Sequence, residues 1–87
     1  MNATSEDCDP EIVAGTLALY YACNKSTKAK VPHQAVASKL SEPYREYVKD
    51  ILKKVRNAGF ANVYPRGDKA YSINMRGIHF LRELGYI

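Results

Sequence analysis

The sequence predicts a small α+β domain that is mostly α-helical, with a three-helix core, a two-stranded β-hairpin and a short C-terminal helix. Two observations predict this architecture. A short helix, a turn and a longer basic helix follow one another between Pro32 and Phe60, and two short apolar stretches flank a turn sequence at 65–68. With 87 residues, of which 46% are hydrophobic and 25% charged, the chain suits one modest core. We expect residues 1–8 to be frayed and residues 9–87 to form the domain.

The first helix is expected to run from Pro10 to about Asn24. Asp9 can cap its first turn, proline suits the first helical position, and Glu11 complements the positive end of the helix dipole. Apolar side chains occupy nearly the whole circumference of this helix, which is typical of a helix that is covered on more than one side.

A stripe of small residues runs along this first helix: Ala14, Gly15, Ala18 and Ala22. The side chains at a contact set how closely two helices approach each other. We therefore predict that the stripe forms a homodimer interface, together with the apolar C-terminal residues Tyr86 and Ile87. The alternative is that neighbouring helices of the same chain cover the stripe.

Residues 24–30, NKSTKAK, form a polar loop with three lysines and no acidic residue. Lys25, Lys28 and Lys30 can contact phosphate, whereas the alternative is an ordinary solvated loop. Val31 precedes a proline and is therefore expected to be extended, as a short first strand of a small sheet.

The segment 32–60 carries a helix-turn-helix pattern. Pro32 is expected to open the second helix, and Ser41-Glu42-Pro43 to end it. The third helix is predicted at residues 43–58, with Gly59 as its left-handed C-terminal cap. One face of this helix is apolar with a helical period and is expected to face the core: Tyr44, Val48, Ile51, Leu52, Val55 and Ala58.

A β-hairpin is predicted over residues 60–73, with strands at 60–64 and 69–73 around a turn at 65–68. Asn74 can cap the last helix, and Gly85 marks its end. The expected buried set of this helix is Ile78, Phe80, Leu81 and Leu84.

Positive charge is concentrated after residue 11. Residues 1–11 contain four acidic side chains and no Lys or Arg, so residues 12–87 carry 13 basic and 5 acidic side chains, a formal charge of +8. Such an excess attracts polyanions at long range, nucleic acid first. The sequence contains no glycine-rich phosphate loop, nucleophile elbow or pair of catalytic carboxylates, so we predict neither enzymatic activity nor a cofactor.

Two cysteines are too few for a disulfide scaffold. If residues 10–23 are helical, Cys8 and Cys23 lie roughly 20 Å apart, too far for a disulfide within one chain. We expect free thiols, and a bridge between two subunits is the alternative. The spacing of these cysteines from His33 and His79 matches no zinc module, and we predict no metal site. The longest apolar run is too short to span a bilayer and no targeting segment is evident, so we expect a cytoplasmic protein.

The predicted order is helix, short strand, helix, turn, helix, two-stranded hairpin and helix. Over residues 10–85 this order and three stretches, HQAVASKLSEPYREYVKDILKKVRNAGF, ANVYPRGDKAYSI and NMRGIHFLRELG, resemble the small winged helix-turn-helix transcription regulators of bacteria and archaea, in the broad MarR/PadR-like group. Residues 55–60 match the phrase that leads into the wing in that group, and Tyr71, Ile73 and Gly77 match the phrase that follows it. Those regulators often dimerise through a long extra terminal helix, for which this sequence shows no counterpart.

The resemblance implies a sequence-specific double-stranded DNA-binding protein, a homodimeric transcription regulator. It would place helix 43–58 in the major groove and use hairpin 60–73 as a wing. The candidate DNA-binding residues are Gln34, Lys39, Ser41, Tyr44, Arg45, Glu46, Lys49, Lys53, Arg66 and Lys69.

Within this set, the first turn of helix 43–58 is expected to contact bases. Arg45 can donate two hydrogen bonds to guanine, and Glu46 can accept one from cytosine. Lys53, one turn further on, and Ser41 with the first amides of the helix are placed for phosphate. The second helix and the wing tip supply the remaining phosphate contacts.

Other interpretations stay open. The acidic and basic residues of helix 43–58 can pair with each other at spacings of three and four, which is typical of a solvated surface helix. The surplus of basic residues on this helix favours nucleic acid instead. The alternative functions are a monomeric winged-helix protein that binds RNA or the ribosome, and a winged helix that binds another protein.

Overall fold

The structure, a computed structural model, describes residues 9–65 and 69–87. It is a mostly helical α+β fold with a single antiparallel hairpin in the described residues, which confirms the predicted α+β class and the hairpin between the third and last helices. The elements are α1 (Pro10–Ala22), α2 (His33–Ala37), the 3-10 helix η1 (Tyr44–Tyr47), α3 (Val48–Asn57), β1 (Ala61–Tyr64), β2 (Ala70–Ile73) and α4 (Met75–Glu83).

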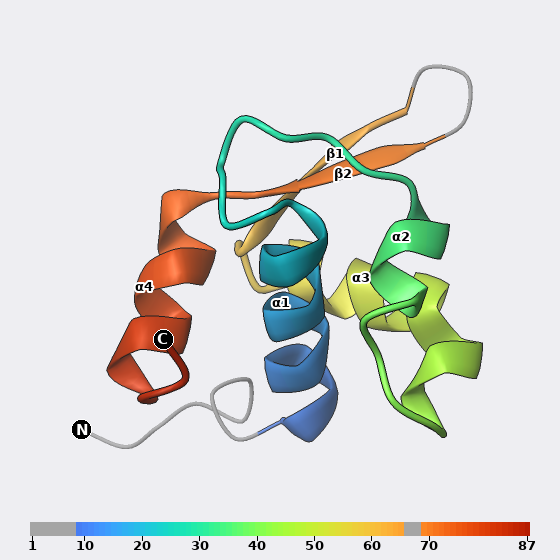
Figure 1. Cartoon of the computed structure of the whole chain (residues 1–87), viewed down its shortest axis with the longest axis horizontal. Coiled ribbons are helices and arrows are strands. Elements are labelled where there is room, and N and C mark those ends of the chain that lie inside the picture. Colours follow the sequence, from blue (N-terminus) through green and yellow to red (C-terminus); the bar gives the residue numbers. More distant parts are fainter. Residues whose placement is uncertain (1–8, 66–68) are drawn as a thin grey trace.

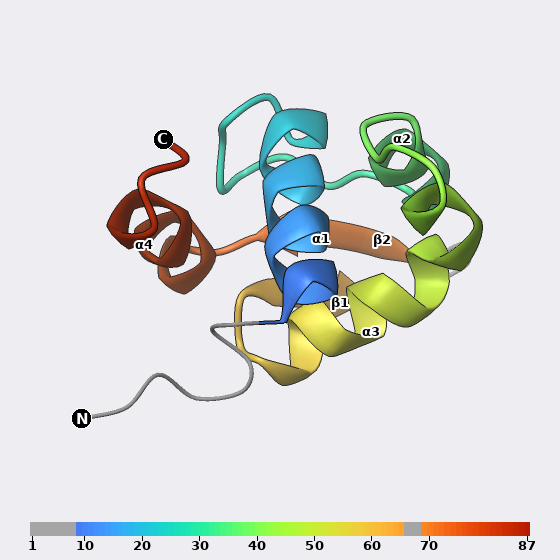
Figure 2. The same ribbon diagram turned by 90° about the horizontal axis from the view of Figure 1, so that it is seen from below.

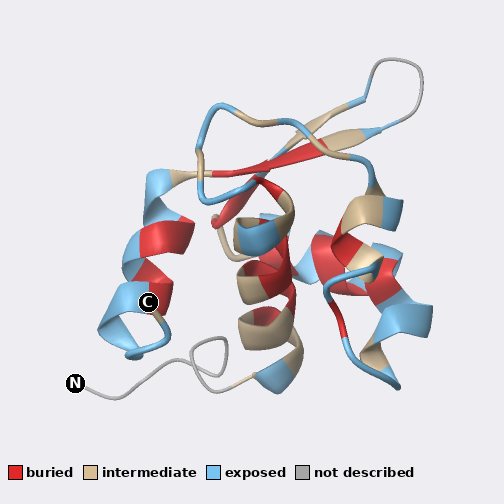
Figure 3. Cartoon of the chain, in the orientation of Figure 1, coloured by how far each residue is buried: buried red, intermediate tan, exposed pale blue. Residues whose placement is uncertain are grey.

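Helix α1 lies in the middle of the molecule. Helix α4 lies on one side of it, α2 and α3 lie on the other, and the hairpin crosses near the C-terminal end of α1 (Figure 1). A view from below shows α3 running across α1 (Figure 2). The elements turn their buried residues toward α1 and one another (Figure 3). The largest fully buried aliphatic side chains come from α1, α3, β2 and α4: Leu19, Ile51, Leu52, Ile73 and Leu81.

The helix ends follow the local signals in the sequence. The Asp9 carboxylate accepts a hydrogen bond from the Glu11 amide at 2.9 Å and caps α1. Asn74 caps α4, and its side-chain nitrogen also donates to the carbonyl of Gly59 at 2.9 Å. Gly59 has a φ of +90°, the left-handed conformation that ends α3 and that glycine adopts without strain. All three predicted caps are confirmed.

The hairpin pairs Ala61 with Ile73 and Val63 with Tyr71. Val31 adds a short third segment, because its amide and carbonyl form hydrogen bonds of 2.8 and 2.7 Å with Tyr71. This confirms the extended conformation expected of Val31. The pairing also fixes the entry to α2 against the hairpin, and that entry becomes one wall of the site described below.

Residues 43–58 do not form one continuous helix, which corrects the expected third helix. Residues 44–47 form the 3-10 helix η1, and α3 begins only at Val48. Pro43 offers no side-chain oxygen to cap a first α-helical turn, and Tyr47 has backbone angles of φ −109° and ψ 23°, outside the helical range. The apolar face of α3 is buried as expected: Val48, Ile51, Leu52 and Val55.

Other elements of the same chain cover part of the small-residue stripe of α1. The prediction that Gly15 and Ala18 contact a second copy is therefore wrong. A β-carbon on Gly15 would overlap Ile51 Cγ2 and come within 2.8 Å of Val55 Cγ2. Ala18 is 3% exposed. Glycine at position 15 therefore lets α1 approach α3 closely, and neighbouring elements of the same chain cover this part of the stripe.

Other residues of α1 and the C-terminal end remain accessible. Ala14 and Ala22 are half-buried, and Tyr21 is exposed. Tyr86 is also exposed, whereas Ile87 packs partly against the core. Leu84 is 43% exposed, so it does not belong to the buried set of α4. No helix in the described parts of the chain is long and apolar enough to cross a membrane.

Candidate nucleic-acid interface

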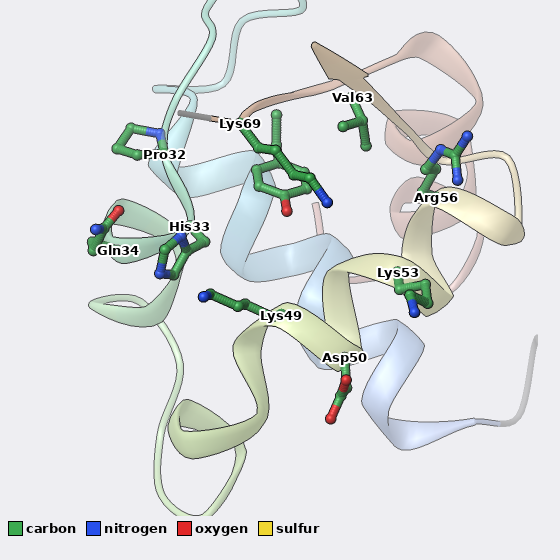
Figure 4. Close-up of a pocket in the computed structure, with 10 residues that line it drawn as sticks. Pro32, His33, Gln34, Lys49, Asp50, Lys53, Arg56, Val63 and Lys69 are labelled. Atoms are coloured by element: carbon green, nitrogen blue, oxygen red, sulfur yellow. The ribbon is translucent and has the colours of Figure 1, made fainter. Parts of the chain in front are cut away.

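A groove of about 520 Å³ lies between α2, α3 and the hairpin (Figure 4). Its side chains come from three separate parts of the chain, so it exists only in the folded state. The lining residues are Pro32, His33, Gln34, Lys49, Asp50, Lys53, Arg56, Val63, Lys69 and Tyr71. Four of these carry a full positive charge, and one carries a negative charge.

Helix α3 supplies most of this charge. Lys49, Lys53 and Arg56 are spaced four and three residues apart, which places them in one stripe along the helix. All three side chains are exposed, because the opposite face of α3 is buried against α1 and the core. The carboxylate of Asp50 points away from Lys69 and toward the outer edge of the groove (Figure 4). The middle of the groove is therefore cationic.

The hairpin closes one side of the groove and α2 the other. Lys69, just before β2, extends toward the middle of the groove (Figure 4). Tyr71 is 7% exposed and forms part of the floor. Because Val31 is paired with Tyr71, the next two residues, Pro32 and His33, lie at the groove edge.

Lys54 lies on a different side of α3 and is neutralised within the chain. Its ammonium group donates a hydrogen bond to Glu11 and lies 3.9 Å from the carboxylate of Asp9. The hydrogen bond to Glu11, followed by the nearby negative charges, raises the pKa of Lys54, and partial desolvation opposes this effect. Asp9 and Glu11 at the start of α1 thus pair with Lys54 of α3. They form no ion pair with the stripe of Lys49, Lys53 and Arg56 that faces the groove.

The structure brings together some of the sequence-predicted DNA-binding residues and separates others. The predicted residues that line the groove are Gln34, Lys49, Lys53 and Lys69. Those that lie elsewhere are Lys39, Ser41, Tyr44, Arg45 and Glu46. Arg66 lies outside the described residues.

Arg45 is engaged with the backbone rather than extended into the groove. Its Nε donates to the carbonyls of Ala37 and Leu40 at 3.1 Å, and its Nη2 donates to Leu40 at 2.9 Å. Its Nη1 also lies 3.7 Å from Glu42. The guanidinium therefore binds carbonyls at and just after the end of α2, a region that favours positive charge.

Ser41 does not cap α3, because the 3-10 helix η1 separates it from Val48. The amide of Arg45 donates to the Ser41 carbonyl at 3.2 Å, so one of the first amides of the predicted helix is already used. The expected phosphate site at this helix start is therefore not formed as predicted. The break at Tyr47, between η1 and α3, is the reason.

The candidate DNA-binding residues predicted from the sequence do not include Arg56, His33 or Tyr71, which line the groove. Arg56 could have been found, because it continues the stripe of Lys49 and Lys53 at helical spacing. His33 and Tyr71 carry no such signal, since their positions depend on the pairing of Val31 with the hairpin.

Cys23 follows α1 and is fully buried as a free thiol. Burial raises the pKa of this thiol, although a backbone hydrogen bond from Ile73 acts in the opposite direction. Cys8 lies outside the described residues. Within the described parts of the chain, no three His, Cys, Asp or Glu side chains gather as potential metal ligands.

Comparisons with protein-family models, with curated protein sequences and with solved structures found no match to this chain.

Proposed function

We propose that this chain is a winged helix-turn-helix protein that binds double-stranded DNA and regulates transcription as a homodimer. The single observation that carries the proposal is the cationic groove between α2, α3 and the hairpin. Its four positive side chains come from α3 and the hairpin, which correspond to the recognition helix and the wing of that fold. A duplex presents one phosphate charge per about 1.7 Å of axis, which suits a row of cations along a helix.

In the proposed complex, the exposed face of α3 enters the major groove, which is wide enough for one helix. Lys49 and Asp50 lie in the first turn of α3 and are assigned to base edges. Lys53, Arg56 and Lys69 are assigned to phosphate on either side of the helix. Arg45 is assigned to positioning, because its donors hold the end of α2.

Dimerisation is proposed through the accessible side of α1 and the C-terminal end rather than through Gly15 and Ala18. The residues available for this contact include Ala14, Ala22, Tyr21 and Tyr86. Sedimentation at tens of micromolar protein tests this part of the proposal, and a monomer at that concentration contradicts it.

Equilibrium titration against duplex DNA and structured RNA of equal length, at several salt concentrations, tests the DNA-binding proposal. The expected result is tighter binding to the duplex DNA, with log K falling by about 0.9 per phosphate neutralised for each decade of salt. The variant Lys53→Ala/Arg56→Ala removes two groove cations assigned to phosphate and should lower this slope by about 1.8. A matched control, Arg76→Ala/Arg82→Ala, removes two exposed cations from α4, outside the groove, and should leave the slope near that of the wild type.

Three results would contradict the proposal. The first is the absence of duplex binding at about 50 mM salt, where phosphate contacts are strong. The second is tighter binding to RNA than to duplex DNA at equal salt. The third is an equal loss of slope in the groove variant and the α4 control, because binding would then depend on net charge rather than on the groove.

A further inference from the structure

The loop between α1 and α2, residues 24–30, forms a second cationic surface that the proposed groove does not use. It contains three lysines and no acidic residue. Lys25, Lys28 and Lys30 are all exposed, and none of them lines the groove. Such a loop is either an ordinary solvated connection or a segment whose backbone holds the lysines in defined positions.

The loop backbone is held by local hydrogen bonds. Asn24 and Lys25 adopt left-handed conformations with φ values of 55° and 64°. The amide of Lys25 donates to the carbonyl of Tyr20 at 2.9 Å, and the amide of Lys28 donates to the hydroxyl of Ser26 at 3.1 Å. A left-handed pair without glycine is uncommon and requires such support. The lysines therefore extend from a defined backbone.

Lys30 is positioned by an aromatic ring of the hairpin. Its ammonium lies 4.4 Å from the centre of the Tyr64 ring, a cation–π contact. Tyr64 also forms a 3.3 Å hydrogen bond with Ser72 across the hairpin. Side chains alternate between the two faces of a strand, so Tyr64 lies on the opposite face from Val63, which lines the groove. Lys30 and the groove thus lie on opposite faces of the hairpin.

The loop lysines differ from Lys54 in their surroundings. Lys54 is paired with two carboxylates. No carboxylate of the described residues lies within ion-pair distance of Lys25, Lys28 or Lys30. No ion pair within the described residues therefore uses the charge of these lysines, and it is available to an anionic partner.

We propose that loop 24–30 is a second phosphate-binding surface, which contacts a nucleic-acid backbone on the face of the hairpin opposite the groove. The inference rests on the proposed DNA-binding function and extends it. The chemistry recognised is the phosphodiester backbone of a duplex. That backbone belongs either to the flank of the duplex held in the groove or to a second duplex.

The test compares three double variants with the wild-type chain: Lys25→Ala/Lys28→Ala in the loop, Lys53→Ala/Arg56→Ala in the groove, and Arg76→Ala/Arg82→Ala on α4. Each removes two exposed cations. One measurement is the salt dependence of binding to a duplex of about three helical turns. The other is the capture of a fluorescent duplex by beads that carry an unlabelled duplex, with and without protein. Circular dichroism melting checks that all variants fold.

If the loop contacts the flank of the same duplex, the loop variant lowers the salt slope by about 1.8 relative to the α4 control. If it contacts a second duplex, the slope is unchanged, but bead capture by the loop variant falls below that of the α4 control. Bead capture that arises from dimerisation alone would persist in the loop variant.

The inference is overturned if the loop variant matches the α4 control in both measurements. If the groove variant loses binding at the same time, the proposed DNA-binding function stands without the second surface. If the wild-type chain binds no duplex, both proposals fail together.

Discussion

Helices α1 and α3 pack against each other, yet they use their surfaces in different ways. Beyond Glu11, α1 has no charged residue, and its buried residues face several neighbouring elements. Helix α3 has one buried apolar face and one exposed face that carries five charged side chains. Helix α1 supports the fold, whereas α3 combines this support with an exposed, mostly basic face.

An amphipathic sequence pattern predicts which face of a helix is buried, whereas a pattern that is apolar all round does not. In α3 the apolar and charged residues separate around the helix, so burial of one face leaves only one possible exposed face. In α1 apolar residues lie all round, so many rotations about the helix axis bury similar apolar area. Its orientation is then decided by shape, and in particular by the missing side chain at Gly15.

The largest expected effect concerns burial within α1. Leu19→Ala should lower the free energy of unfolding by about 2–5 kcal/mol, because Leu19 is fully buried and the change leaves a cavity. Leu17→Ala makes the same chemical change at a half-buried position on the same helix and should cost less. Urea denaturation measures both. Equal losses would mean that α1 is not oriented as described.

A somewhat smaller effect is expected at the contact between α1 and α3. Gly15→Ala should destabilise the fold by about 1–3 kcal/mol, since the added methyl group overlaps Ile51, although alanine favours a helix more than glycine does. The cost should shrink in an Ile51→Ala background, where space is available. A double-mutant cycle by urea denaturation measures this coupling. Strict additivity of the two changes would contradict the close approach.

A smaller effect is expected at Arg45, in η1, and it distinguishes a residue that contacts bases from one that positions the backbone. Arg45→Ala should lower the free energy of unfolding by about 1 kcal/mol, because the Leu40 carbonyl, just after α2, loses two hydrogen bonds from the guanidinium. Glu42→Gln removes only the exposed ion pair and should change stability by less than about 0.5 kcal/mol. A loss of base preference in Arg45→Ala, measured by binding competition and without a loss of stability, would restore Arg45 as a base reader.

The smallest effect concerns the buried thiol that follows α1. Because burial raises the pKa of Cys23, the folded chain keeps this proton at a pH where the unfolded chain has lost it. The contribution of Cys23 to stability should therefore fall as pH rises above the usual thiol range, by at most about 1.4 kcal/mol per pH unit. Chemical denaturation under reducing conditions, at about pH 8 and pH 10, measures it. Cys23→Ala should show a flatter pH dependence than the wild type, and identical slopes would exclude this effect.

Much of the fold could be predicted because its signals are local. The caps at Asp9, Gly59 and Asn74 each depend on residues no more than a few positions away, and the hairpin depends on a turn between two apolar stretches. The same locality explains why Lys49, Lys53 and Lys69 were found as candidates, since basic residues on an amphipathic helix and beside a turn are expected at the surface. The break before Val48 had no equivalent signal.

The site as a whole could not be predicted from the sequence. Arg45 and Lys49 look alike as basic residues near the start of one predicted helix, but the carbonyls of Ala37 and Leu40 occupy Arg45. The turn between α2 and η1, in place of the expected helix from Pro43, brings those carbonyls to Arg45. His33 reaches the groove because Val31 pairs with Tyr71, forty residues later in the chain. The sequence by itself determined the order of elements, their caps and the excess of positive charge, because these depend on neighbours along the chain. The tertiary structure alone decided which face of α1 is covered, which cations gather in one groove and which are neutralised, because these depend on distances between residues that are far apart in the sequence.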